Sequence, residues 1–441
     1  HLLHKGSPGV QLIIAIREMK LRGIVHGIQR EMRQVNIMKY ESLSKIYYVS
    51  PDNYMKEYTS RFMFPYSMHL GIRIRQYNRK HDFEAFFYYP NEIAILLEKI
   101  HKSYEEFLAV ESQVPPVVLH QFSLLSILDE VKSTNDIEGV RSTRKEIREI
   151  IDGVQPRSGR LESIVNKYIS LMTDTEIDFN TCQDIRNFFD DFAHKEISKE
   201  NPNRQLDGEI FRKDPVDIAS AAGKTIHQGL FPESVIISTM NEALKILHRE
   251  DILVLVRLGL FHYFFAYIHP FYDGNGRTDR FITSYFLGKF FQTIPALRLS
   301  VYIQKNKKKY YDLFSEADSE INRGDLTPFI IGFLEIIHGT VLDTIGLLRR
   351  KNDQLNKYKN QIEKLGLEDE LLSGMYYILL QAALFYGQGV SISDLMQITG
   401  KSRGTIQKRM EKIPEEHMLI TKVGKVNYYK LNLKLFSSNR S

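Results

Sequence analysis

The sequence predicts a mainly α-helical protein with a helical core, one short β-hairpin and a separate C-terminal unit. Three observations predict this fold class. Apolar residues recur at helical spacing from Asn91 onward, glycines and prolines interrupt that pattern in residues 206–232, and the predicted helices become short after residue 370. With 441 residues, 43% hydrophobic and 26% charged, the chain is long enough for two or three domains and too apolar to be mainly disordered.

Residues 1–89 form an N-terminal region to which the sequence assigns no role. Residues 38–89 are rich in Tyr, Phe and Arg and show no sustained helical period. The chain begins with His1, and Met38 is a candidate natural start, which would make residues 1–37 a tag, upstream readthrough or a disordered arm. Their short apolar run lacks the cleavage pattern of a signal peptide.

Residues 90–350 are predicted to form the helical core, in which helix follows helix. The expected boundaries are an N-cap at Asn91 after Pro90, a break at Pro115 and Pro116, a capping box formed by Thr143 and Glu146, and an end at Gly153. The span 160–200 is expected to be helical as well.

The almost continuously apolar segment Ile252–Ile268 is the strongest candidate for a membrane span. It contains Arg257 and His262, so we interpret it as the central helix of the core, apolar on all sides, and expect no membrane partner. A long final helix of the core is predicted to begin near residues 324–328, with Asp325 or Thr327 as its cap.

Residues 206–232 combine glycines, prolines and β-branched residues, which favours a short β-hairpin. We expect its two arms at Phe211–Ile218 and Lys224–His227.

Residues 370–436 are predicted to form three short helices followed by a hairpin that turns at Gly424. This is the pattern of a winged helix-turn-helix domain. Residues 401–434 hold nine Lys or Arg and three acidic residues, a net charge of about +6, which fits contact with a phosphate backbone. Many winged helices bind only protein, and a basic face can simply be solvated, so DNA as a partner stays open.

The richest chemistry lies in His269–Arg280, which reads HPFYDGNGRTDR. The turn Gly274-Asn275-Gly276 can direct backbone N–H groups into one concavity, and the helix that follows adds the positive end of its dipole. Arg277 and Arg280 share one side of that helix and could each grip a phosphate. Asp273 could hold a hard cation, and His269 is the candidate general base. The segment therefore predicts a nucleotide triphosphate site.

This string resembles the Fic family signature at every defined position. The resemblance implies a cytoplasmic protein adenylyltransferase that moves AMP from ATP, with Mg²⁺, to a Ser, Thr or Tyr hydroxyl of a target protein or of the chain itself. It implies that His269 is catalytic, that Asp273 binds the metal and that Phe271 is a packing anchor. Asn275 and neighbouring amides would stabilise the α-phosphate, and Arg277 would balance charge on the leaving group. The implied ATP-binding residues are Asp273, Gly274, Asn275, Gly276, Arg277, Arg280 and Tyr311.

A second segment, STNDIEG at Ser133–Gly139, resembles the inhibitory motif of many Fic proteins, with Thr134, Glu138 and Gly139 at its defined places. The family implies that Glu138 pairs with Arg280. A carboxylate and a phosphate oxygen cannot occupy one guanidinium fork together, so this pair would block ATP.

Further residues are implied by the same resemblance. The hairpin would be a flap that aligns the target segment by strand addition, with Thr225, Ile226 and His227 beside the target, although a loop histidine more often simply packs. Tyr310 and Tyr311 match a tyrosine pair near adenine, and either could instead belong to the core. Asp318 stands where relatives often have Asn, which puts an adenine contact there in doubt.

Rival interpretations remain. Some Fic relatives transfer UMP, phosphocholine or phosphate, and the phosphate-transferring branch has Lys where this chain has Gly276. The chain could also be an ATP-sensing transcriptional regulator that binds DNA, or a toxin–antitoxin component. The single cysteine, Cys182, excludes an intramolecular disulfide and favours a reducing compartment. The sequence leaves open whether the chain forms a homodimer.

Overall fold

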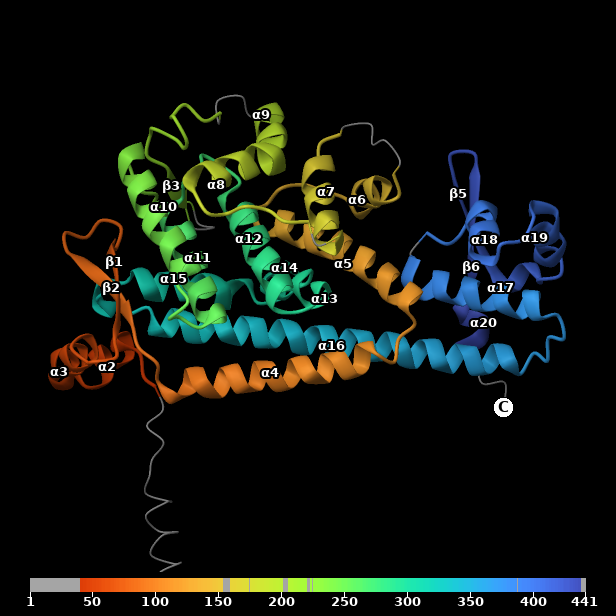
Figure 1. Cartoon of the computed structure of the whole chain (residues 1–441), viewed down its shortest axis with the longest axis horizontal. Helices are drawn as coiled ribbons and strands as arrows, with labels where there is room; N and C mark the ends of the chain where they lie inside the picture. The colour runs from red at the N-terminus through yellow and green to blue at the C-terminus, as the bar shows by residue number, and fades with distance from the viewer. Residues whose placement is uncertain are drawn as a thin grey trace, which may run out of the picture.

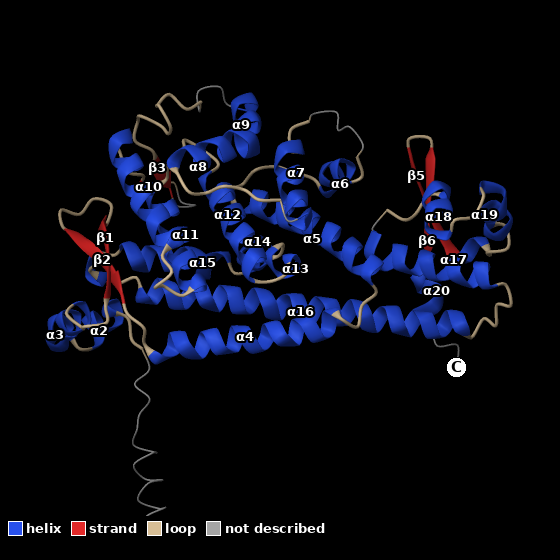
Figure 2. Cartoon of the chain, viewed as in Figure 1, coloured by secondary structure: helices blue, strands red, loops and turns tan. Residues whose placement is uncertain are grey.

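The structure is a computed structural model that describes residues 40–153, 159–173, 175–200, 205–219, 223, 225–386 and 388–437. Helices dominate this part of the chain, and its strands pair as three separate two-stranded hairpins (Figure 2). The predicted mainly α fold class is confirmed. The expectations for residues 1–37, for Met38 and for Lys224 lie outside the described residues.

The N-terminal region, to which the sequence assigned no structure, contains two helices and a hairpin. They are α2 (Leu43–Val49), α3 (Pro51–Phe62), β1 (Met68–Arg75) and β2 (Asp82–Phe87). β1 and β2 are antiparallel, with an irregularity in register between His69 and Arg73. One face of the hairpin alternates into the core through Leu70, Ile72 and Ile74.

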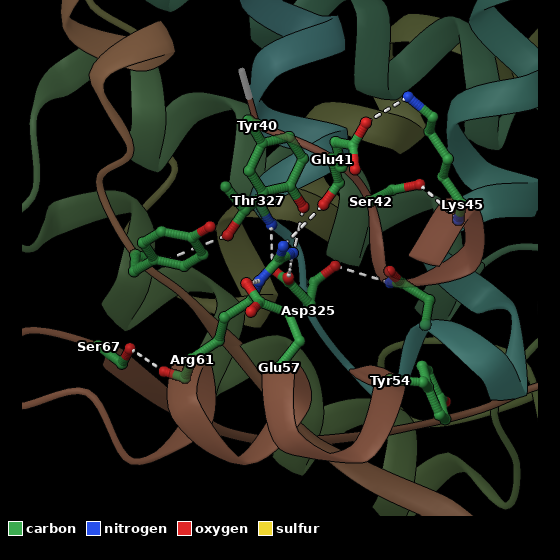
Figure 3. A network of polar contacts seen from close by, with 12 residues as sticks. Tyr40, Glu41, Ser42, Lys45, Tyr54, Glu57, Arg61, Ser67, Asp325 and Thr327 are labelled. Carbon is green, nitrogen blue, oxygen red and sulfur yellow. Dashed lines mark hydrogen bonds and ion pairs between the residues drawn. The ribbon is translucent and has the colours of Figure 1, made fainter. Parts of the chain in front are cut away.

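A buried polar network fastens this region to the core (Figure 3). Arg61 donates to Asp325 at 3.3 Å and to the Glu41 carbonyl at 2.8 Å, and the Tyr40 hydroxyl also reaches Asp325 at 3.3 Å. Asp325 is fully buried and accepts from the Thr327 N–H at 2.9 Å. Because a buried carboxylate needs such partners, residues 40–61 are part of the folded unit.

Two long helices form the base of the molecule, α4 (Asn91–Glu111) and α16 (Thr327–Glu363), which lie side by side (Figure 1). The N-cap of α4 is Pro90 and not Asn91, because Asn91 already has helical backbone as the first residue. Leu326 is the N-cap of α16, and Asp325 contributes by accepting the Thr327 N–H. Both corrections are shifts of one or two residues.

The helix α11 (Val254–Ile268) passes through the centre and is buried on nearly every side, as predicted. Among the described residues, α16 is long and apolar enough by composition to cross a membrane. Its apolar stretch is 56% buried within the protein, as in a core helix.

The core contains further elements before and after α11. They are α5 (Pro116–Ile137), α6 (Arg144–Ile151), α7 (Glu162–Ser170), a 3₁₀ turn (Leu171–Thr173), α8 (Cys182–Phe189), a π-helical turn (Asp190–His194), α9 (Lys195–Glu200), β3 (Asp217–Ala219), β4 (Thr225–Gln228), α10 (Glu233–His248), α12 (Asn275–Phe290), α13 (Thr293–Ala296), α14 (Leu299–Lys305), α15 (Lys307–Asp318) and a 3₁₀ turn (Glu320–Asn322). The capping box of Thr143 and Glu146 at the start of α6 is confirmed.

After α16 come the three short helices and the hairpin that the sequence predicted. They are α17 (Glu370–Gln381), a π-helical turn (Ala382–Tyr386), α18 (Ile392–Thr399), α19 (Arg403–Met410), a 3₁₀ turn (Glu415–His417), β5 (Met418–Val423), β6 (Val426–Leu431) and α20 (Leu433–Ser437). Their assignment as a winged helix-turn-helix domain stays a prediction.

The core of this C-terminal unit is continuous with the base of the molecule. A second hydrophobic cluster joins Leu379 and Phe385 to Val118 and Phe122 of α5 and to Leu348 of α16. The beginning of α5, the helix that leads to Glu138, therefore packs with the C-terminal unit.

Two of the unit's basic residues are already paired within it. Arg409 and Lys412 lie 3.2 and 3.5 Å from Asp369, which reduces the positive charge they can offer to a partner.

Candidate active site

The loop between α11 and α12 carries the residues of the predicted site. His269 ends α11 with a left-handed backbone (φ 53°), and its N–H donates to the Phe265 carbonyl at 3.0 Å. Gly274, with φ 79°, then begins α12 as its N-cap. Phe271 is fully buried and stacks on Phe189 with ring centroids 3.7 Å apart, so its predicted role as a packing anchor is confirmed.

Asn275 closes this loop through its side chain, and its predicted contact with the α-phosphate stays a prediction. Its carboxamide oxygen accepts from the Phe271 N–H at 2.9 Å, and its nitrogen donates to the Phe271 carbonyl at 2.7 Å. Both ends of the side chain are thus bound to one residue of the loop. The backbone N–H groups of the first turn of α12 remain suited to an anion, because they have no acceptor within the helix.

Glu138 lies over that first turn. Its carboxylate is 2.8 Å from Nη2 of Arg280, and a Cβ added to Gly276 would lie 2.2 Å from Glu138 Oε1. Only glycine at position 276 allows the carboxylate this close to the backbone. Arg280 is itself 1% exposed and also donates to the side chain and the carbonyl of Thr134, at 3.0 and 3.1 Å. The structure therefore brings together the pair that the sequence predicted, and Thr134 orients the guanidinium.

Arg277 is held by a carboxylate that the sequence analysis missed. Its Nη1 donates to Glu196 of α9 at 3.0 Å, and both side chains are almost fully buried. Asp273, at the exposed lip, is 3.8 Å from Arg277 Nη2 and accepts from the Gly274 N–H at 2.6 Å. Arg277 is therefore paired with a buried carboxylate, that of Glu196, whereas the carboxylate in contact with Arg280, that of Glu138, is partly exposed.

The imidazole of His269 can accept a proton only in its neutral form, and its surroundings favour that form. Burial is the main cause that lowers the pKa of His269 to about 3, and His227 and Arg212 act in the same direction. The ring therefore stays neutral at physiological pH.

Arg212, fully buried and also missed from the sequence, ties the flap region to this loop. It donates to the carbonyls of His269 at 2.9 Å, Leu230 at 2.9 Å and Asp214 at 2.5 Å. A Cβ at Gly229 would lie 2.3 Å from Arg212 Nη2 and 2.9 Å from His269 Cβ, so the strand leaving the flap touches the candidate base directly.

The predicted hairpin is present, with shorter arms than expected. β3 and β4 pair antiparallel, Asp217 opposite Gln228 and Ile218 opposite His227. Phe211, expected in the first arm, is instead fully buried in the core.

The predicted flap residues divide into two kinds. Ile226 is 46% exposed and Thr225 is half-buried, which suits contact with a target. His227 turns inward: it bonds to the Tyr267 carbonyl at 2.7 Å and lies 3.5 Å from Asp318. The contact of His227 with the target stays a prediction, and in the structure its ring is bonded to the core.

The two tyrosines, Tyr310 and Tyr311, also differ in burial. Tyr310 is buried, and its hydroxyl bonds to His262 at 2.8 Å, whereas Tyr311 is 39% exposed. Asp318 accepts from Tyr263 at 2.7 Å. Only Tyr311 is in a position to stack on a base.

Within the described ranges no group of three or more His, Cys, Asp or Glu side chains could hold a metal ion. Asp273 alone fits a magnesium ion that takes its other ligands from phosphate and water.

The comparisons with known proteins agree with this local geometry. Residues 186–287, a segment that contains the whole candidate loop, match the model of the Fic/DOC family. The chain is 41% identical over 70 residues to "Protein adenylyltransferase Fic" of Aedes aegypti, covering 16% of this chain and 12% of the relative. It is 26% identical over 173 residues to "Protein adenylyltransferase fic-1" of Caenorhabditis elegans, covering 36% and 32%. The chain thus spans a third or less of the length of these relatives.

Solved structures with similar folds include a Fic family protein from Desulfovibrio desulfuricans G20. The two are 20% identical with a TM-score of 0.47, over 77% of this chain and 96% of that one. Fic-1 of Caenorhabditis elegans is 16% identical with a TM-score of 0.40, over 58% and 74%.

Proposed function

We propose that this chain is a protein adenylyltransferase that transfers AMP from ATP to a Ser, Thr or Tyr hydroxyl of a target protein, and that Glu138 inhibits it. The match of residues 186–287 to the Fic/DOC family model and the partial relatives named as adenylyltransferases support the reaction. One observation carries the proposal: a carboxylate lies on the first turn of α12 and pairs with Arg280 at 2.8 Å, in a place built to receive an anion.

In this reaction the target hydroxyl gives its proton to the neutral imidazole of His269 as its oxygen attacks the α-phosphorus. A new O–P bond forms, the bond between the α-phosphorus and the bridging oxygen breaks, and pyrophosphate leaves with that oxygen. Arg212 and Asn275 keep the loop in place, and the first-turn N–H groups of α12 stabilise the charge on the phosphates. When bound, a magnesium ion at Asp273 would neutralise phosphate charge.

Inhibition follows because the Glu138 carboxylate and a phosphate of ATP would bind the same side of Arg280. Arg280 can hold the Glu138 carboxylate or a phosphate oxygen of ATP in that direction, and not both. A charge-assisted hydrogen bond contributes roughly 1.5–3 kcal/mol, which is enough to change occupancy about tenfold or more.

The test is transfer of label from α-³²P-ATP to the chain itself and to lysate proteins. Glu138→Gly should raise labelling by about tenfold or more. Asp136→Gly is the matched control, because Asp136 is an acidic residue near the same helix end that pairs with Lys132 and not with Arg280. Adding His269→Ala to Glu138→Gly should reduce labelling by about 10²–10⁴-fold while ATP still binds. Equal labelling with and without His269 would show that the assigned base is wrong.

The same assay separates the rival group transfers. Label from the γ-phosphate of ATP, from UTP or from CDP-choline should not appear on protein at a comparable rate. Preferred use of any of these would replace AMP transfer as the proposed reaction.

A further inference from the structure

A cavity of about 300 Å³ lies between the tip of the β1–β2 hairpin and the end of the flap. One wall is formed by residues 75–79 of the tip, the other by residues 227–231, and Tyr267 contributes to its floor. None of these residues has a part in holding ATP. The cavity is therefore separate from the anion site on α12, although it borders the same loop.

The backbone joins this cavity to the candidate base. Gly229 lines the cavity and is in contact with His269, as the clash of an added Cβ shows, and the Leu230 N–H donates to the Ile268 carbonyl at 3.0 Å. On the other wall the Arg75 N–H donates to the Tyr267 hydroxyl at 2.9 Å. Both walls are thus fastened to the end of α11, one or two residues before His269.

The cavity is lined by positive charge. Arg75 is exposed at its edge, and its side chain pairs with no carboxylate among the described residues. Arg79 is 3.6 Å from Glu320, but that carboxylate also binds His81 at 2.6 Å. On the flap side, Asp318 is occupied by His227 and Tyr263, and Asp217 accepts from Gln228 at 2.8 Å. Arg75 therefore offers a ligand a guanidinium group with no carboxylate partner among the described residues, and Arg79 adds a second one that is in contact with Glu320.

We propose that this cavity binds a carboxylate side chain of the target protein, held by Arg75 and Arg79 close to the hydroxyl that is modified. The inference rests on the proposed function and adds a target preference to it. A target segment that pairs with an edge of the two-stranded flap is extended, so residues two apart face the same side about 6.5 Å from each other. The acidic residue is therefore two positions from the acceptor hydroxyl.

The experiment uses the full chain carrying Glu138→Gly and fluorescent peptides with one Tyr acceptor. The peptides have Glu or Lys two positions before or after the Tyr. We expect kcat/KM for AMP transfer to be about tenfold higher for one of the Glu peptides than for its Lys counterpart, since an ion pair with arginine is replaced by repulsion. Arg75→Glu with Arg79→Glu should reverse this preference.

Lys80→Glu is the matched control, because Lys80 lies in the same exposed turn and does not line the cavity. It should leave the preference unchanged. Equal use of Glu and Lys peptides by the starting protein, or a preference that survives reversal of both arginines, would overturn the inference.

Peptide binding, measured by fluorescence anisotropy without ATP, separates the two proposals. Binding of the Glu peptide that is lost in the double arginine variant, with no AMP transfer to any peptide, would remove the proposed reaction and keep the cavity assignment. AMP transfer at equal rates to Glu and Lys peptides would keep the proposed reaction and remove the cavity assignment.

Discussion

Glu130 and Glu138 both come from α5, and each lies at the start of another helix. Glu130 accepts from the Ser300 N–H at 2.9–3.0 Å, at the beginning of α14. Glu138 lies on the first turn of α12 and pairs with Arg280 at 2.8 Å. Glu130 is fully buried, whereas the Glu138 side chain is 29% exposed.

This difference in burial separates a structural contact from a replaceable one. A ligand cannot reach Glu130 without opening the core, so its bonds to α14 persist as long as the fold does. Glu138 borders solvent, although its partner Arg280 is buried, so under the proposed inhibition a phosphate could take the place of its carboxylate without opening the core. The same attraction between a carboxylate and a helix N-terminus thus serves two purposes in one helix.

The largest expected effect is on stability. Glu130→Ala leaves the Ser300 N–H without its acceptor and opens a small cavity, so the free energy of unfolding should fall by about 3 kcal/mol. Glu138→Ala should lower it by less than Glu130→Ala does, because the Glu138 side chain is 29% exposed, so water can take its place, and Arg280 keeps its bonds to Thr134. Urea unfolding of both variants measures this. Equal losses would end the distinction between the two carboxylates.

A second expected effect is that the free energy of unfolding depends on pH through Glu130. Burial raises the pKa of Glu130 to about 7, from 4.5 in the unfolded chain. Because the folded state holds this proton more tightly, the contribution of Glu130 to stability is present below pH 4.5 and is lost as pH rises to 7. Between pH 5 and pH 7 the protein should lose about 2 kcal/mol relative to Glu130→Gln. If the difference in free energy of unfolding between the two proteins were the same at pH 5 and pH 7, this prediction would be contradicted.

A third, smaller effect concerns nucleotide affinity. Glu138→Gly should tighten ATP binding about tenfold, because Arg280 becomes available to phosphate. Glu130→Gln should change the affinity less, because Glu130 bonds to the start of α14 and acts on Arg280 only through space. Isothermal titration calorimetry compares them. A gain in the Glu130 variant of the same size would show that α5 acts through its packing and not through the Glu138 carboxylate.

The smallest expected effect is that the NMR signals of the His269 ring should not change with pH. Burial disfavours charge at His269 as it does at Glu130, and lowers the pKa of His269 to about 3. Its ring resonances in the NMR spectrum should stay constant from pH 8 to pH 5, where an ordinary histidine titrates. A midpoint for His269 near 6.5 would mean that the ring faces water.

Much of the site could be predicted because its residues are close in sequence or belong to a recognisable string. The loop, the helix start and the pair of Glu138 with Arg280 were predicted in this way. Glu196 and Arg212 were not, because their partners are 81 and 57 residues away and no local pattern marks them. The bonds of the Asn275 side chain to Phe271 were not predicted either, because the string does not show that it turns back onto this residue.

The fold was predicted to a similar extent. Helical spacing identified α4 and α11, but the N-terminal region was missed because its short elements depend on distant contacts. Arg61, for example, is held by Asp325, 264 residues away.

The position of α5 has one further consequence. The helix begins among Val118 and Phe122, which pack with Leu379 and Phe385 of the C-terminal unit, and it ends at Glu138 (Figure 1). A continuous helix of 22 residues is about 33 Å long and bends little, so it behaves as a rod. The helix therefore forms one continuous connection between the packing of the C-terminal unit and Arg280, the arginine that Glu138 contacts.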